Sequence, residues 1–349
     1  MSWKSRCYAG ACFLLSLSLF QPAVLADSFT SNVFATGGAL GVTHPDSVTL
    51  GDGSVWIAYT NGTNGTGGGG NSTVVQYGTS GVVLSTYSIA GSVDGLKFNP
   101  STGQVWALQN QDGNSALTII NPTTHTLTPV SYAVTSPTSG FDDVVFNGSQ
   151  TYLSQTNPAS PTDPIIVNLT NSVSPLTVGT ILTKGALGMN NDPDSLKLSP
   201  SGSLVLSSGD DGTLTFVANP GTGSQSVSFL QLSNATGAAV SGLDDSLYAT
   251  ATQGTIYLTD TGANTVYAIQ ASGLTLGELF AAVGSEKAFG TVDLSTGLFT
   301  TINIGSSLTS PHGLAFATPE PGTFALALGG LVLLVAYGIG RGGLAEPGA

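Results

Sequence analysis

The sequence contains few charges and almost no sulfur. Of its 349 residues, 7 are Lys or Arg and 20 are Asp or Glu, so 8% are charged, where soluble domains average about 25%. The net charge of −13 excludes the basic surface that a nucleic-acid-binding protein needs. Residues 27–318 contain no arginine, so this region lacks the guanidinium groups that bind anionic polymers through paired hydrogen bonds.

Both cysteines, Cys7 and Cys12, lie in an N-terminal segment that is typical of a secretory signal. Lys4 and Arg6 precede an apolar run at residues 9–20, and Val24 and Ala26 occupy the −3 and −1 positions before a predicted cleavage site at Asp27. We therefore expect residues 1–26 to be a signal peptide that directs export through the Sec pathway. Its removal would leave a mature chain without a thiol, a disulfide or a cysteine metal ligand.

The C-terminal segment, residues 319–349, combines three features in a fixed order. Pro319-Glu320-Pro321 comes first, an apolar run without charge follows at residues 324–340, and Arg341 ends that run. Seventeen apolar residues are at the short end of what spans a bilayer, and a basic residue after the span favours a cytoplasmic C-terminus. The pattern predicts one transmembrane helix at residues 324–340.

This segment resembles the PEP-CTERM sorting signal of Gram-negative bacteria, which has a Pro-Glu-Pro motif, an apolar helix and a basic end. The residues that match the motif are Pro319, Glu320, Pro321 and Arg341. The resemblance implies an exosortase as partner, processing at the membrane, and a final location on the cell surface or in an exopolysaccharide matrix such as a biofilm. The basic end is reduced here to a single arginine, and a plain C-terminal anchor is the alternative.

Residues 27–318 repeat one short pattern in which an Asp is followed by small or polar residues and then by alternating apolar positions. Copies lie at residues 45–50, 93–98, 141–146, 193–198 and 243–248, and a final copy at 311–316 has His in place of Asp. From Asp46 the steps are 48, 48, 52, 50 and 68 residues. Each copy is followed by a turn and a second β-branched or aromatic strand.

About 50 residues holding about four strands is one blade of a β-propeller. We predict an all-β fold with six blades, with seven as the alternative. We expect residues 244–276 to form one full blade. Residues 279–304 would form most of another, completed by a strand at 33–35 and by residues 313–316, so that the two chain ends close the ring. The copies resemble NHL-type and YVTN-type propeller repeats, and Trp56, Trp106, Tyr152 and Tyr257 are expected to pack between blades.

The recurring Asp is the best candidate for a functional residue. The innermost strand of each blade lines the central channel, so side chains at its start should gather at one mouth. Converging carboxylates repel one another unless they are protonated or bound to a cation. We expect either a hard-cation site, most plausibly for Ca²⁺, or carboxylates that accept hydrogen bonds from backbone N–H groups of their own turn or of the next blade. The candidate metal ligands are Asp46, Asp94, Asp142, Asp194, Asp244 and His312.

The sequence offers little for catalysis. It contains no Gly-x-Ser-x-Gly motif, and the mature chain would contain no cysteine nucleophile. We therefore expect an exported, non-enzymatic structural or binding module of the cell envelope or extracellular matrix. The alternative is a metal-dependent hydrolase of the gluconolactonase-like propeller type, in which a cation at the channel mouth activates water.

Overall fold

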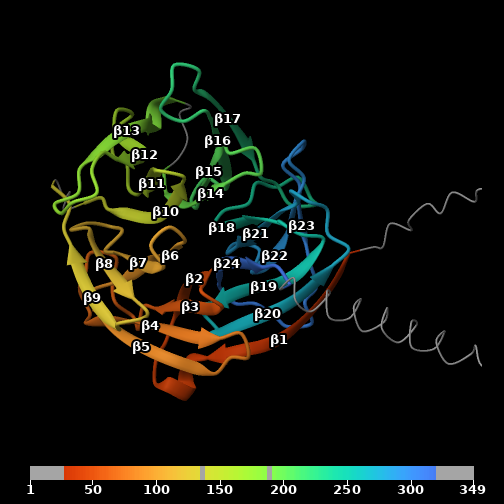
Figure 1. The fold of residues 1–349 in the computed structure, drawn as a ribbon. Coiled ribbons are helices and arrows are strands. Elements are labelled where there is room, and N and C mark those ends of the chain that lie inside the picture. The colour runs from red at the N-terminus through yellow and green to blue at the C-terminus, as the bar shows by residue number, and fades with distance from the viewer. Residues whose placement is uncertain (1–26, 134–137, 187–190, 320–349) are drawn as a thin grey trace, which may run out of the picture.

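The computed structural model describes residues 27–133, 138–186 and 191–319. Within them the chain forms six antiparallel four-stranded sheets, which Figure 1 shows arranged around a common centre. The predicted signal peptide, the predicted transmembrane helix and the motif residues Glu320, Pro321 and Arg341 lie outside the described residues. Among the residues that are described, no helix is both long enough and apolar enough to cross a bilayer.

Four of the sheets are formed by consecutive strands, from the channel outward. The first contains β2 (Pro45–Gly51), β3 (Ser54–Tyr59), β4 (Asn71–Gly78) and β5 (Val83–Ala90). The second contains β6 (Val93–Asn99), β7 (Gln104–Gln109), β8 (Ala116–Asn121) and β9 (Thr126–Val130). The third contains β10 (Phe141–Asn147), β11 (Gln150–Gln155), β12 (Pro164–Leu169) and β13 (Val178–Thr183). The fourth contains β14 (Pro193–Leu198), β15 (Leu204–Ser208), β16 (Thr213–Ala218) and β17 (Ser226–Gln231). Two 3₁₀ turns, η1 (Gly37–Leu40) and η2 (Lys184–Ala186), lie between strands.

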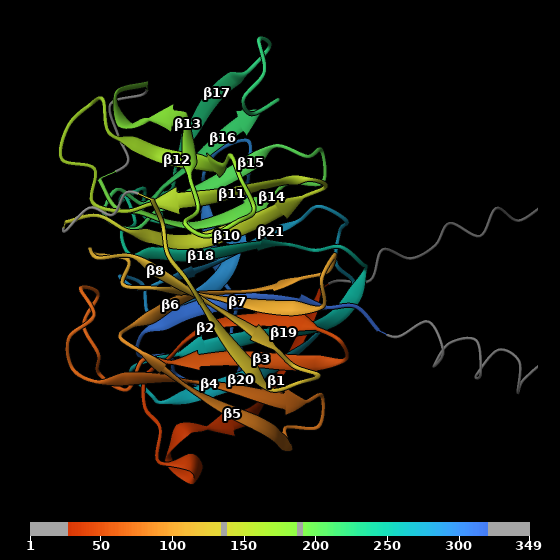
Figure 2. The ribbon, with the colours of Figure 1, turned by 60° about the vertical axis from the view of Figure 1, so that its left-hand side comes forward.

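The last two sheets exchange strands. The fifth contains β18 (Leu243–Tyr248), β21 (Leu279–Val283), β22 (Ala288–Val292) and β23 (Phe299–Thr301). The sixth contains β24 (Pro311–Ala317), β19 (Gln253–Asp260), β20 (Thr265–Ser272) and β1 (Ser28–Thr36). In Figure 1 the strands β19, β20 and β1 lie next to one another, as their pairing requires, and Figure 2 shows the propeller from another side.

Six blades are confirmed, and so is the closure of the ring by the two chain ends in one sheet. The predicted membership of the last two blades was wrong, because the hairpin β19–β20 belongs to the sixth blade and not to the blade that β18 begins. The physical reason is that β21, Leu279-Phe280-Ala281-Ala282-Val283, is buried along its whole length. Such a strand fits best beside the inner strand, between two other blades, and it pairs with β18 from Leu243 to Tyr248.

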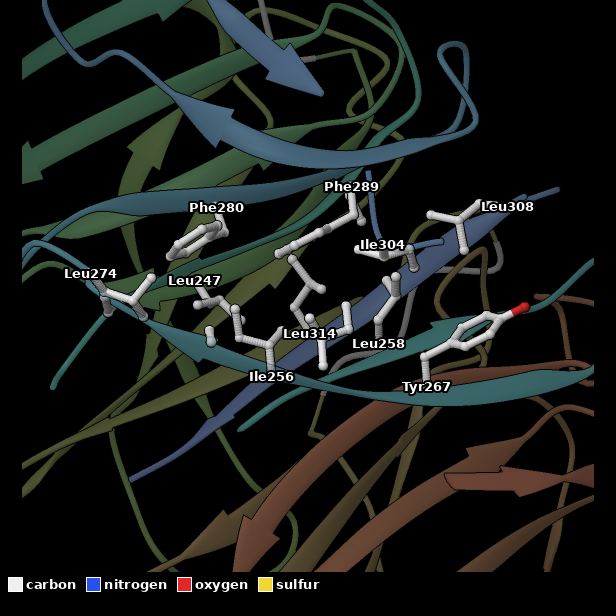
Figure 3. Packing of buried hydrophobic residues seen from close by; sticks show 14 residues of the cluster. Leu247, Ile256, Leu258, Tyr267, Leu274, Phe280, Phe289, Ile304, Leu308 and Leu314 are labelled. Atoms are coloured by element: carbon white, nitrogen blue, oxygen red, sulfur yellow. The ribbon is translucent and has the colours of Figure 1, made fainter. Parts of the chain in front are cut away.

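One apolar cluster fills each of the six interfaces between neighbouring blades. Figure 3 shows the cluster between the fifth and sixth blades, where Phe280 and Phe289 stack with ring centroids 5.5 Å apart. Trp56, Tyr152 and Tyr257 belong to three other clusters, and Trp106 packs against a fourth. The predicted role of these aromatic side chains between blades is therefore confirmed.

Candidate functional site

The inner strands β2, β6, β10, β14, β18 and β24 surround the central channel (Figure 1), and each begins at the same end of it. The repeated Asp is the second residue of its strand. In every blade the pairing of the inner strand is irregular at this point. Such a bulge redirects the side chains beside it, so the repeated Asp and the residue that follows it can face different partners.

The six candidate ligands come together as predicted. A cavity of about 30 Å³ on the axis is lined by all five aspartates: Asp46, Asp94, Asp142, Asp194 and Asp244. His312 completes the circle, with its Nε2 atom 3.5 Å from Oδ1 of Asp244 and 3.8 Å from Oδ1 of Asp46. We call these six side chains the carboxylate ring.

Burial and mutual repulsion change the ionisation of this ring. Burial, together with the charges of Asp94 and Asp244, raises the pKa of Asp46 well above its usual range. Burial, together with Asp94, raises the pKa of Asp142, and burial, together with Asp142 and Asp244, raises the pKa of Asp194. Burial raises the pKa of Asp244 to about 7, although His312 opposes this shift. Burial alone would lower the pKa of His312, but Asp244 and the Ser310 carbonyl outweigh it and raise that pKa.

The residue after each ring member joins its blade to the next. Leu96 N donates to Ser47 Oγ at 3.1 Å, Leu196 N donates to Asp143 Oδ2 at 3.0 Å, and Leu314 N donates to Asp245 Oδ2 at 2.7 Å. Ser195 Oγ donates to Asp245 Oδ1. In the two remaining blades the residue is glycine, and a Cβ atom on Gly95 or Gly313 would collide with a carbonyl of the following inner strand.

The repeat pattern predicted this backbone-binding role, as an alternative, for the repeated Asp itself. Between described residues, no backbone N–H donates to a carboxylate of the ring, and the role belongs to the residue one place later. Asp143 and Asp245 were not singled out from the sequence. The signal that could have found them is the Asp-Asp pair in the third and fifth copies, where the other copies have Asp or His followed by serine or glycine.

Two lysines occupy the middle of the channel, at the third position after the ring Asp in their copies. Lys197 Nζ lies 2.7 Å from Asp143 Oδ2 and 2.8 Å from Asp245 Oδ1. Burial alone would lower the pKa of Lys197, but these two carboxylates raise it. Burial alone would likewise raise the pKa of Asp143, yet Lys197 and Lys97 lower it. Lys97 is the second of the two lysines. Burial lowers its pKa, Asp143 and Asp245 oppose this shift, and the neighbouring Lys197 adds to it.

At the other end of the inner strands a larger cavity of about 380 Å³ opens. We call it the apolar mouth. Lys97 and Lys197 line it together with side chains at the ends of the inner strands, namely Leu50, Phe98, Phe146, Leu198, Tyr248 and Phe316. Lys197 also lines the carboxylate cavity, so it separates the two. The channel thus has a carboxylate end, a layer of compensated charge and an apolar end.

The described residues do not place any three or more His, Cys, Asp or Glu side chains in an arrangement that could hold a metal ion. The ring carboxyls are close enough for the charge of one to raise the pKa of another, as Asp94 does for Asp46 and Asp142 does for Asp194. The cation site therefore stays a prediction. The remaining candidate sorting residue, Pro319, is exposed and lies beside Ser28 in a surface groove.

No protein-family profile matches the chain, and no curated protein matches it significantly. Solved structures do match. One is a protein of unknown function from Bacteroides caccae, with 10% identity over 79% of this chain and 87% of that one and a TM-score of 0.50. Another is named a putative gluconolactonase, with 13% identity, 84% and 87% coverage and a TM-score of 0.52. Virginiamycin B lyase from Staphylococcus aureus matches at 14% identity, 83% and 82% coverage and a TM-score of 0.46. Likeness at this level of identity shows the propeller fold and carries no function with it.

Proposed function

We propose that the chain is an exported β-propeller that is held at the cell envelope by its C-terminal segment and acts there as a non-catalytic structural or binding module. The observation that carries this proposal is the closure of the ring. All six sheets are complete with strands between Ser28 and Ala317, so no strand of the described propeller is supplied by the segments predicted to direct export and sorting.

The position of the chain ends supports a tether. β1 is the outermost strand and β24 the innermost strand of one blade, and Ser28 and Pro319 line the same surface groove. β24 begins at the carboxylate ring and ends beside the apolar mouth, which Phe316 lines. A C-terminal anchor would therefore hold the apolar mouth toward the membrane and the carboxylate ring away from it.

The space around the ring favours a binding or structural role over hydrolysis. A propeller hydrolase needs a metal with an open coordination position and room for its substrate. The carboxylate cavity of about 30 Å³ has space for about two water molecules, whereas ligand pockets usually measure about 300 Å³ or more. Lactone hydrolysis that requires a divalent metal and is lost in Asp194→Ala would contradict the proposal.

The decisive experiment separates sorting from simple anchoring. In a cell that contains an exosortase, the full chain is compared with a variant lacking residues 319–349 and with the triple variant Pro319→Ala, Glu320→Ala, Pro321→Ala. We expect the deletion to release a folded propeller from the membrane and the triple variant to stay unprocessed in the membrane. An unchanged location of the deletion variant would contradict the tether. Normal processing of the triple variant would favour a plain anchor.

A further inference from the structure

The apolar mouth combines hydrophobic walls with one ammonium group that is not directly compensated. Phe98, Phe146 and Leu198 are among its walls, and Lys97 lines it from the middle of the channel. Between described residues, Lys97 Nζ makes no ion pair within 4 Å and no hydrogen bond to an acceptor. A buried ammonium group that contacts no acceptor and lies beside a second ammonium group, that of Lys197, is costly, and an anionic ligand would reduce that cost.

The neighbouring acidic groups are already occupied. Asp143 Oδ2 and Asp245 Oδ1 both contact Lys197 Nζ, at 2.7 and 2.8 Å. The same carboxylates also accept hydrogen bonds from backbone N–H groups: Leu196 N donates to Asp143 Oδ2 and Leu314 N donates to Asp245 Oδ2. Burial lowers the pKa of Lys97; Asp143 opposes this shift, and the adjacent Lys197 adds to it. The surroundings of Lys97 therefore favour an added negative charge.

The carboxylate ring does not oppose an anion at the other end. Lys197 stands between the two cavities, and three ring carboxyls, those of Asp46, Asp142 and Asp194, have a raised pKa that keeps them protonated to higher pH. The ring therefore presents less negative charge to the apolar mouth than five ionised carboxylates would.

We propose that the apolar mouth is a binding site for a small amphiphilic carboxylate, with the carboxylate accepting hydrogen bonds from Lys97 Nζ and the hydrocarbon chain lying along Phe98, Phe146 and Leu198. The volume of about 380 Å³ is within the range of ligand pockets. A charge-assisted hydrogen bond fixes the head group, and burial of the chain supplies the rest of the affinity. The site is independent of where the protein is held in the cell.

The test compares octanoate with its uncharged analogue octanamide by titration calorimetry on the folded propeller. We expect octanoate to bind at least about tenfold more tightly than octanamide, because only the acid offers a charged acceptor. In Lys97→Met the two ligands should bind equally and weakly. Lys287→Met removes an exposed lysine and is the charge-matched control, which should retain the full difference. Leu198→Glu should weaken the binding of both ligands.

Three results would overturn the proposal: no octanoate binding at millimolar concentration, equal affinity of acid and amide for the unaltered chain, or a preference for the acid that persists in Lys97→Met. Should Lys97→Met fail to fold, the comparison of acid with amide on the unaltered chain still decides. Failure here leaves the envelope proposal intact, because localisation is measured separately.

Discussion

Asp142 and Asp143 are neighbours in one strand, yet they meet opposite electrostatic surroundings. Asp142 faces other carboxyl groups in a cavity of about 30 Å³, and burial together with Asp94 raises its pKa. Asp143 bonds Lys197 and the backbone of the next blade, and the lysines lower its pKa in spite of burial. The bulge at the start of β10 separates the two side chains. Adjacent residues of the same type can therefore carry unrelated roles, one in the ring and one between blades.

Removing the carboxylate of Asp143 should have the largest effect on stability. Asp143→Ala leaves Leu196 N without its acceptor and removes one of the two carboxylates that neutralise Lys197. We expect a loss of about 3–5 kcal/mol in the free energy of unfolding. Asp142→Asn is the matched variant, because an amide imitates the protonated carboxyl and cannot ionise in the unfolded chain. At pH 7 it should therefore not lower the free energy of unfolding and should raise it.

Urea unfolding followed by circular dichroism measures both variants. Equal losses of unfolding free energy in the two variants, or a larger loss in Asp142→Asn, would show that the ring carboxyl, and not Asp143, joins the blades. The slope against urea concentration should be the same for both, since neither substitution changes the surface that unfolding exposes.

The raised pKa values of the ring and the lowered pKa of Asp143 also predict how stability depends on pH. A carboxyl whose pKa is raised in the folded state holds a proton that the unfolded chain loses above its ordinary value of 3.8. Its contribution therefore declines as pH rises from about 4 through the folded pKa, which is about 7 for Asp244. The raised pKa of His312 acts in the same direction, since that contribution is complete below 6.5 and is lost above it. Asp143 loses its contribution only as pH falls below 3.8.

Between pH 5 and pH 8 the ring should therefore dominate, and the free energy of unfolding should fall by a few kcal/mol, on the order of 1.4 kcal/mol for each unit of pKa difference. Urea unfolding at intervals of one pH unit measures the decline. The double variant Asp142→Asn, Asp194→Asn should flatten it, whereas Asp52→Asn, at an exposed turn with a positive φ that asparagine tolerates, should leave it unchanged. A stability that rises toward pH 8 in the unaltered chain would contradict the raised pKa values.

The sequence predicted the ring more accurately than the contacts that stabilise it. A spacing near 50 residues, with one Asp at each copy, was enough to place five aspartates and His312 on the axis, because a propeller repeats its inner strand at one place in each blade. The exchange of β19–β20 between blades was not predictable, since a local pattern defines a hairpin and not the sheet that it joins. The roles of Asp143 and Lys197 depend on a bulge and on a partner about 50 residues away, which no local pattern contains.

The smallest expected effect concerns the cation, which would compete with the protons that the ring carboxyls hold because their pKa is raised. If Ca²⁺ binds there, it should raise the melting temperature at pH 8, where the ring loses protons, and should have less effect at pH 5, where protons compete. Saturation at 100 times the dissociation constant would add about 2.7 kcal/mol. Asp194→Asn should abolish the shift and Asp52→Asn should retain it. Calorimetry that detects no heat at pH 8, together with an unchanged melting temperature, would exclude the cation and leave protonation as the means by which the ring tolerates five converging carboxyl groups.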